Sequence, residues 1–181
     1  MKESNLRKTT DPIENTTQFV HRGAHSVLDV FGPTVEFLIL PEEPDAGYCV
    51  MIGTVPPGVS VPLHSHPDAE SFYILSGSVR TIDQRGDTLE WRTVNAGEFA
   101  HIPGNAKHAW QNASNEPSVQ LIRTTPKLGR FSREIGRPVS AGSPAKPPTP
   151  EDLQHLLRTA GKYGYLMASP EENAALGIVI E

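Results

Sequence analysis

Between residues 17 and 125 the chain alternates short apolar runs with clusters of turn-forming residues. The apolar runs are rich in β-branched and aromatic residues, as strands are, and they read HSVLDVF, TVEFLIL, YCVMIGTV, SFYILSG, SVRTI, TLEWRTV, GEFAHIP, KHAWQN and SVQLIRTT. Segments such as PEEPDAG, VPPG, QRGD and PGNA separate them. Many short strands with no helical period between them predict one all-β domain over 17–125, an antiparallel sandwich or barrel.

The remainder of the chain has a different pattern. Residues 1–16 are polar, and we expect a flexible N-terminus there. Residues 126–150 hold six prolines and three glycines, which predicts an extended linker that either wraps the barrel or forms a disordered tether. Residues 151–181 are predicted to form a short helical C-terminal tail.

Helix start signals support the tail. Thr149 can cap a helix whose first residue is Pro150, and acidic residues follow in its first turn. Gly161 or Gly164 can end that helix. A second start at Ser169, with Glu172 completing a capping box, predicts a short helix over ENAALG.

Composition narrows the class of protein. The 181 residues carry a net charge of −5 and no basic stripe, so a nucleic-acid partner is not expected. No apolar run approaches the roughly 20 residues of a membrane span, and the N-terminal stretch lacks the apolar core of a secretory signal. The single cysteine, Cys49, is expected to be a buried free thiol. We therefore expect a cytoplasmic protein with no membrane association.

Two stretches hold candidate metal ligands. On a strand, His64 and His66 point to the same face, about 6–7 Å apart, where both can reach one cation. Glu70 follows after a Pro-Asp turn, so the alternation of side chains along a strand does not fix the face to which Glu70 points. If Glu70 faces inward, Phe72 and Ile74 share its side. His108, after the Pro-Gly-Asn turn, can join the set in an antiparallel fold.

Three imidazoles and one carboxylate favour a particular group of metals. This mixed nitrogen and oxygen set suits one divalent transition metal, namely Fe, Mn, Ni, Co, Cu or Zn, and is a poor match for Mg or Ca. Sulfur ligands are not expected, because the only cysteine lies in another stretch.

The same two stretches resemble the motifs of the cupin superfamily. The first motif, Gly-x5-His-x-His-x3,4-Glu-x6-Gly, is matched in full by the stretch GVSVPLHSHPDAESFYILSG, from Gly58 to Gly77. The second, Gly-x5-Pro-x-Gly-x2-His-x3-Asn, is matched from Gly97 to Asn112 except that Asn105 replaces a glycine. Asparagine tolerates the left-handed conformation that such a turn can require. The match to the two motifs is strong over Gly58–Asn112, and the strand pattern extends the resemblance to Gln18–Thr125.

The resemblance implies a single jelly-roll-like cupin β-barrel of two antiparallel sheets with a metal near its mouth. The family's ligand positions fall on His64, His66, Glu70 and His108, and small single-domain cupins often form homodimers. His101, although inside the second motif, has no ligand role in it. A small-molecule pocket lined by Phe72, Ile74 and Trp110 is expected, with Phe37, Tyr48 and Phe99 as further candidates.

Three functions are compatible with such a site. The first is a metal-dependent dioxygenase acting on a flavonol-like aromatic or enolic compound, with Glu70 as the catalytic base. A loose similarity to quercetinase-type bacterial cupins, one barrel followed by a Pro-rich segment and a helical tail, favours it. The second is a non-oxidative isomerase or decarboxylase of a small oxo acid, for which Arg80, Arg92 and Arg123 are the candidate cationic groups. The third is a non-enzymatic small-molecule-binding cupin.

Overall fold

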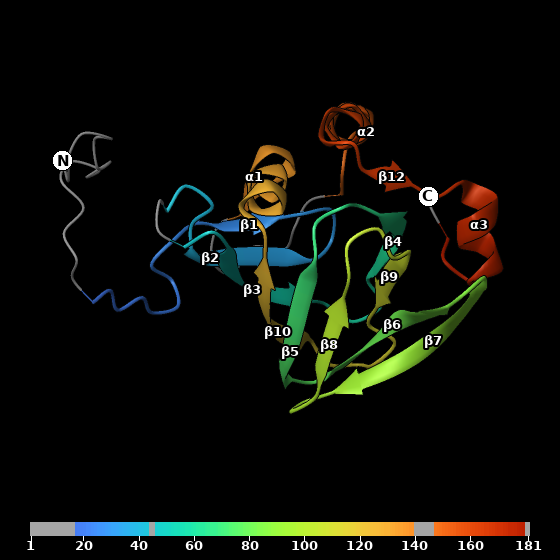
Figure 1. Cartoon of the computed structure of the whole chain (residues 1–181), viewed down its shortest axis with the longest axis horizontal. Helices are drawn as coiled ribbons and strands as arrows, with labels where there is room; N and C mark the ends of the chain where they lie inside the picture. The colour runs from blue at the N-terminus through green and yellow to red at the C-terminus, as the bar shows by residue number, and fades with distance from the viewer. Residues whose placement is uncertain (1–16, 44–45, 140–146, 180–181) are drawn as a thin grey trace.

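The structure is a computed structural model that describes residues 17–43, 46–139 and 147–179 (Figure 1). The predicted flexible N-terminus, 1–16, lies outside the described residues, as does most of SAGSPAKPP. The described strands are β1 Val27–Asp29, β2 Thr34–Ile39, β3 Cys49–Val55, β4 Ser60–Ser65, β5 Glu70–Ser76, β6 Ser78–Arg85, β7 Thr88–Asn95, β8 Phe99–Ile102, β9 His108–Gln111, β10 Ser118–Thr124, β11 Arg137–Val139 and β12 Leu166–Met167. The described helices are α1 Pro126–Ile135, α2 Pro150–Tyr163 and α3 Pro170–Ala175.

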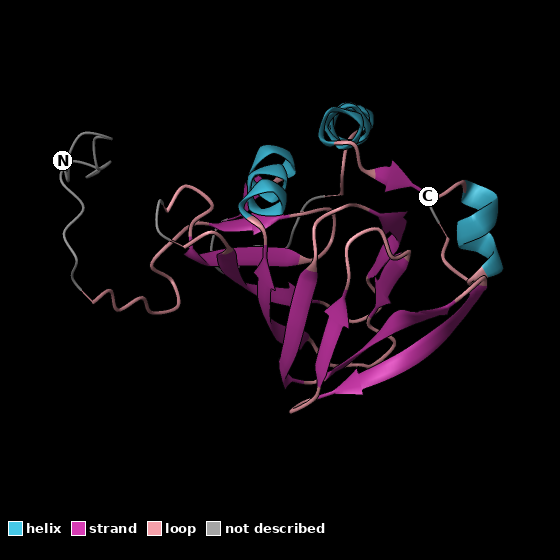
Figure 2. Ribbon diagram, in the orientation of Figure 1, coloured by secondary structure: helices cyan, strands magenta, loops and turns pink. Residues whose placement is uncertain are grey.

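The strands form two antiparallel sheets, drawn in magenta in Figure 2. The seven-stranded sheet has the order β11-β1-β2-β3-β10-β5-β8, and the five-stranded sheet has the order β12-β4-β9-β6-β7. Strands distant in sequence are neighbours in both sheets, as β3 and β10 show. The all-β, jelly-roll-like fold with helices in the C-terminal tail is confirmed.

The core lies between the two sheets. Strand β5 shows how the sequence builds it, because Glu70, Phe72 and Ile74 are buried while Tyr73 and Leu75 are 43% and 47% exposed. This alternation is that of a half-buried strand, and it confirms that Glu70 shares a side with Phe72 and Ile74. The buried residues of the main core cluster are Val35, Phe37, Cys49, Met51, Phe72, Ile74, Val79, Val94, Ile102, Trp110 and Ile122.

Two turns require backbone conformations that few residues adopt. Gly77, between β5 and β6, has φ +71°, and a Cβ there would lie 2.6 Å from the carbonyl oxygen of Pro117. Asn105 has φ +68°, the left-handed conformation expected for an asparagine that replaces glycine in this turn. The Asn105 turn ends three residues before His108, so it helps to set where β9 begins.

The expectation of an extended linker over 126–150 is wrong for its first part. Thr125 caps α1 by accepting a hydrogen bond from the Leu128 amide, and Pro126 occupies the first helical turn. A proline at that position promotes a helix, because the missing N–H would have no helical partner anyway. Gly129 permits close packing, since a Cβ there would lie 2.6 Å from the Cys49 Sγ.

Helix α1 covers the only cysteine. Cys49 is fully buried and free, as the sequence predicted. Burial, together with the negative charges of Glu70 and Glu42, raises the pKa of the Cys49 thiol to about 12.

The predicted tail helices are confirmed, including their caps. Thr149 and Ser169 each form a capping box at the start of α2 and α3, and Gly164 ends α2 in the left-handed conformation. Between the two helices lies β12, which the sequence did not predict. It pairs with β4, with Leu166 opposite Ser65 and Met167 opposite His64.

Ion pairs fix α2 against the elements beside it. Arg137 on β11 pairs with the buried Asp29 of β1 and with Asp152 of α2. Lys162 near the end of α2 pairs with Glu134 of α1 at 2.7 Å. Within the described ranges, none of the helices has the length and apolar character of a membrane span.

Candidate metal centre

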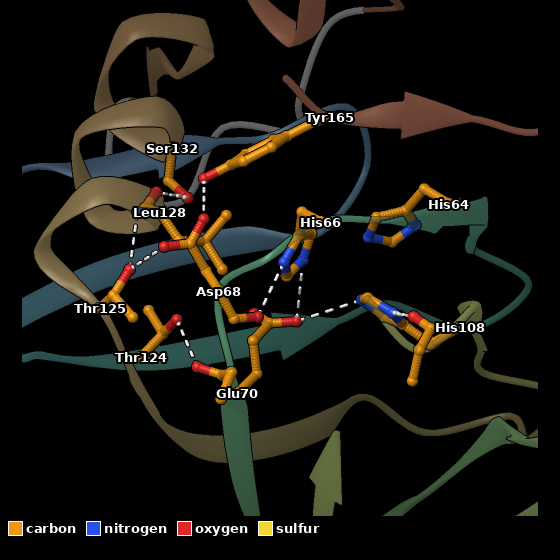
Figure 3. A network of polar contacts seen from close by, with 12 residues as sticks. His64, His66, Asp68, Glu70, His108, Thr124, Thr125, Leu128, Ser132 and Tyr165 are labelled. Atoms are coloured by element: carbon orange, nitrogen blue, oxygen red, sulfur yellow. Dashed lines mark hydrogen bonds and ion pairs between the residues drawn. The ribbon is translucent and has the colours of Figure 1, made fainter. Parts of the chain in front are cut away.

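Three histidines meet at one end of the space between the sheets (Figure 3). His64, near the end of β4, is the register partner of His108, the first residue of β9, and His66 follows just after β4. The ring centroids of His64 and His108 are 4.1 Å apart, and His66 lies 5.5 Å and 4.9 Å from them. One nitrogen of each ring lies within 4.8 Å of the other two, so the cluster can hold a metal ion.

Backbone carbonyl groups fix the orientation of all three rings. The Nδ1 atoms of His64, His66 and His108 lie 2.7 Å, 2.9 Å and 2.9 Å from the carbonyl oxygens of Pro62, Asp68 and Ala106. A carbonyl oxygen only accepts, so each Nδ1 is the protonated nitrogen that donates. Each neutral imidazole therefore has its lone pair on Nε2, and this second hydrogen bond is how metal-binding histidines are usually held.

Glu70, the first residue of β5, places its carboxylate beside two of these rings. Its Oε2 is 3.2 Å from His108 Nε2 and 3.5 Å from His66 Nε2 (Figure 3). The carboxylate is almost fully buried, and the buried His108 Nε2 has no hydrogen-bond partner. An anionic oxygen facing two lone pairs is unfavourable unless a cation or a proton lies between them. The donor set therefore fits a divalent transition metal.

The electrostatics of the metal-free cluster follow from burial and from these contacts. Burial, reinforced by the neighbouring His108, lowers the pKa of His64 to about 3, so this ring stays neutral. Burial alone would raise the pKa of Glu70, but His108 and His66 hold it well below its usual range. Burial opposes a charge on His66, and the hydrogen bond and charge of Glu70 outweigh it and raise the pKa of His66.

The expected pocket residues are part of the core. Phe72 and Trp110 are each 5% exposed with ring centroids 4.2 Å apart, and Ile74 is fully buried. Phe72 follows Glu70 on the inner face of β5, and Trp110 follows His108 on β9, so both lie directly beyond candidate ligands. Their role as a substrate surface stays a prediction.

The further pocket candidates lie elsewhere. Phe99 faces out and is 62% exposed, because it pairs with the outward Tyr73, so its assignment to the pocket is wrong. Tyr48 lies under the Arg123 guanidinium, 4.8 Å from it. Phe37 is buried in the main core cluster.

His101 is separate from the cluster. It lies on β8 opposite Ser71, is exposed, and has its Nδ1 3.1 Å from the Ser71 hydroxyl. The three clustered histidines do not include it, in keeping with its lack of a ligand role in the motif.

Sequence reasoning missed two polar residues beside the histidines. Asp68, in the Pro-Asp turn, and Tyr165, between α2 and β12, are both buried and joined by a hydrogen bond of 2.7 Å (Figure 3). Asp68 could have been found from the sequence, because it is the acidic residue nearest to His66 along the chain. Tyr165 carried no signal, because only the tertiary fold brings the tail to the histidine strand.

Comparison with known proteins gives one family match, over the strands that carry the candidate ligands. Residues 51–122, which include all four candidate ligands, match the family model described as the cupin domain. Residues 51–122 of the chain are therefore a cupin domain, the class of fold that the two motifs predicted. No curated protein matches it in sequence.

Several solved structures are similar to part of this chain. The cupin domain of an XRE-family transcriptional regulator from Enterobacter cloacae is 21% identical, with 52% of this chain and 96% of that one covered and a TM-score of 0.43. Oxalate decarboxylase from Bacillus subtilis is 24% identical over 56% of this chain and 28% of its own, with a TM-score of 0.49. The DMSP lyase DddQ from Ruegeria pomeroyi is 21% identical over 50% and 45%, with a TM-score of 0.43.

Proposed function

We propose that the chain is a metal-dependent dioxygenase that acts on a flavonol-like aromatic or enolic small molecule. In this proposal His64, His66, His108 and Glu70 hold one divalent transition metal. The observation that supports this metal site is the orientation of the three imidazoles. Their Nδ1 atoms all donate to backbone carbonyl groups, and their free nitrogens converge beside the Glu70 carboxylate. The identity of the metal, among Fe, Mn, Ni, Co, Cu and Zn, is left to the experiment.

The chemistry divides between the metal and the chain. A divalent transition metal held by these four residues would supply Lewis-acid and redox chemistry at this site. Glu70 is the catalytic residue in this proposal, because its buried Oε2 lies beside His108 and His66, where a carboxylate can accept the proton of an enol or phenol. In the proposed reaction both oxygen atoms of O2 enter the products and the enolic substrate supplies the four electrons, so no external reductant is required.

The surroundings of the candidate ligands favour a flat, apolar ligand. Phe72, Ile74 and Trp110 are packed core residues beyond Glu70 and His108 on the inner strand faces, and the Tyr165 ring lies beside His66. Aromatic walls with a few polar groups are typical of sites that bind planar organic molecules.

Oxygen uptake tests this function. The purified protein is loaded separately with each of the six metals and supplied with a panel of flavonols and 1,3-diketones. We expect O2 consumption equal to substrate loss with at least one metal, and none with His108→Ala. Binding of a panel compound without O2 consumption would favour the non-enzymatic binding cupin instead.

A non-oxidative isomerase or decarboxylase is a second candidate, but the predicted cationic groups do not support it. Arg80 contacts Gln111 and the Trp91 ring, and Arg123 lies over Tyr48. Arg92 is exposed on β7. Lys127 is the cationic group to test instead, because its Nζ lies 5.2 Å from the centroid of the Tyr165 ring, which packs against His66. Turnover of an oxo acid without O2 consumption, lost in Lys127→Met, would identify this activity.

We also propose a homodimer formed through the outer face of the seven-stranded sheet. Leu121, Tyr73 and Phe99 are register partners across β10, β5 and β8 and form one outward row, whereas Ile52 of β3, the partner of Leu121, is only 7% exposed. Tyr73 and Phe99 are 43% and 62% exposed, and Leu75 beside them is 47% exposed. An apolar row of this kind is self-complementary, so a second copy related by a twofold axis can cover it.

A further inference from the structure

Tyr165 is the residue through which the C-terminal tail reaches the histidines. It lies between α2 and β12, and the pairing of β12 with β4 holds it above the histidine strand. The Tyr165 side chain is buried, and its ring centroid is 5.0 Å from that of His66. Figure 3 shows the hydroxyl of Tyr165 pointing away from the rings, towards the Asp68 carboxylate.

Asp68 connects this hydroxyl to a candidate ligand. One carboxylate oxygen accepts from the Tyr165 hydroxyl at 2.7 Å, and the other accepts from the Thr125 hydroxyl. The backbone carbonyl of the same residue accepts from His66 Nδ1 at 2.9 Å. The side-chain bonds therefore hold in place the residue whose carbonyl sets the orientation of the His66 ring.

The chain of contacts is buried and has few ways to relax. Asp68 and His66 are 6% and 4% exposed, so water has little access to replace a lost hydrogen bond. Thr125 is itself fixed, because it caps α1. The Tyr165 ring also packs against Phe131 and Tyr163, with centroids 4.7 Å and 5.7 Å away.

We propose that Tyr165 is a positioning residue of the metal centre, which acts through Asp68 to hold the His66 ring in its metal-binding orientation. The proposal rests on the proposed metal-binding function and adds to it that the tail beyond residue 150 is part of the site. Tyr165 does not ligate the metal in this proposal, because its hydroxyl is engaged by Asp68 and points away from the free imidazole nitrogens.

The test removes the hydroxyl and leaves the ring. Tyr165→Phe and the wild-type protein are titrated with Co²⁺, and affinity and the visible absorption spectrum are measured. Tyr163→Phe is the matched control, because it loses the same group from the same aromatic cluster but from a hydroxyl that donates to the exposed side of Glu134. Groups that support metal ligands typically contribute about 10- to 100-fold to affinity. Tyr165 acts through one further residue, so we expect a loss near the lower end, about tenfold, with an altered Co²⁺ spectrum.

The outcomes separate this proposal from the one on which it rests. If the wild-type protein binds no Co²⁺, the proposed metal centre itself is wrong. If the wild-type protein binds Co²⁺ and Tyr165→Phe binds it equally tightly with the same spectrum, the positioning role is wrong. An equal loss in Tyr163→Phe would also overturn it, because the effect would then belong to the aromatic cluster as a whole.

A second variant covers the case in which Tyr165→Phe does not fold. Asp68→Asn keeps the backbone carbonyl that accepts from His66 and changes only the group that meets the two hydroxyls. We expect it to weaken Co²⁺ binding and to alter the spectrum in the same way. An unchanged Co²⁺ affinity in folded Asp68→Asn would overturn the proposal.

Discussion

His64 and His108 are register partners on adjacent antiparallel strands, with ring centroids 4.1 Å apart. The pairing of β4 with β9 therefore joins the two sequence motifs into one site. A shift of one residue in this register would turn one of the two imidazoles to the other face of the sheet. The irregularity between Val61 and His64 lies next to this pair and sets its register.

The first prediction concerns the ligands. His66→Ala and His108→Ala should each lose at least nine-tenths of the bound metal, because either change leaves too few donors for a tight site. Elemental analysis of protein purified in the presence of metal measures this. His101→Ala is the control and should keep its metal, since His101 lies on β8 away from the cluster. Full metal content in both ligand variants would refute the assignment.

The second prediction separates the two roles of Glu70. Glu70→Gln keeps the shape and an oxygen donor but removes the base. We expect the rate of O2 uptake to fall by about 10²- to 10⁴-fold, the usual contribution of a general base. Metal content, measured on the same samples, should fall much less than in His108→Ala. A variant with normal turnover would mean that another group accepts the proton.

The third prediction concerns acid stability of the metal-free protein. The pKa of His64 is lowered from 6.5 to about 3, so between these values the unfolded state binds a proton that the folded state does not. Stability should therefore fall as the pH falls from 6.5 towards 3, by up to about 1.4 kcal/mol per pH unit for this one group. Glu70 also makes stability fall with falling pH, below pH 4.5, because its pKa is lowered in the folded state. The raised pKa of His66 has the opposite effect and adds stability as the pH falls.

Urea unfolding at pH 7 and pH 5, in the presence of a chelator, tests this prediction. His64→Leu isolates the contribution of His64, because it keeps Glu70 and His66. Its free energy of unfolding should depend less on pH than that of the wild type. Equal pH dependence in the two proteins would contradict the burial of a neutral His64.

The fourth prediction concerns the proposed dimer. Phe99→Glu introduces a charge into the outward row of the seven-stranded sheet, and sedimentation equilibrium should then show a monomer. Leu157→Glu is the matched control, because Leu157 is similarly exposed, at 58%, but lies on α2. A monomeric wild-type protein would contradict the proposed dimer. A dimer that is lost in Leu157→Glu but kept in Phe99→Glu would contradict it as well.

The sequence predicted the parts of this structure that depend on local patterns. Strand alternation placed His64 and His66 on one face, and the capping residues Thr149 and Ser169 marked two helix starts. The cupin resemblance brought His108 and Glu70 to the same site, which local pattern alone could not do.

The parts of the structure that the sequence did not predict depend on neighbouring residues and tertiary contacts, which local patterns do not contain. The six prolines and three glycines of 126–150 predicted an extended linker, although Pro126, with Thr125 before it, begins α1. Phe99 was assigned to the pocket because its aromatic character does not reveal which face of β8 it occupies. Tyr165 and β12 reach the histidines only through tertiary pairing with β4, which no short-range signal announces.

That pairing has a consequence for biosynthesis. The four candidate ligands lie between residues 64 and 108, whereas the segment that covers them begins at Tyr165 and leaves the ribosome later. The ligand residues are therefore synthesised before the segment that packs Tyr165 on His66. In the proposed metal centre, an ion would meet the His66 side of the site without the Tyr165 ring until the tail has docked.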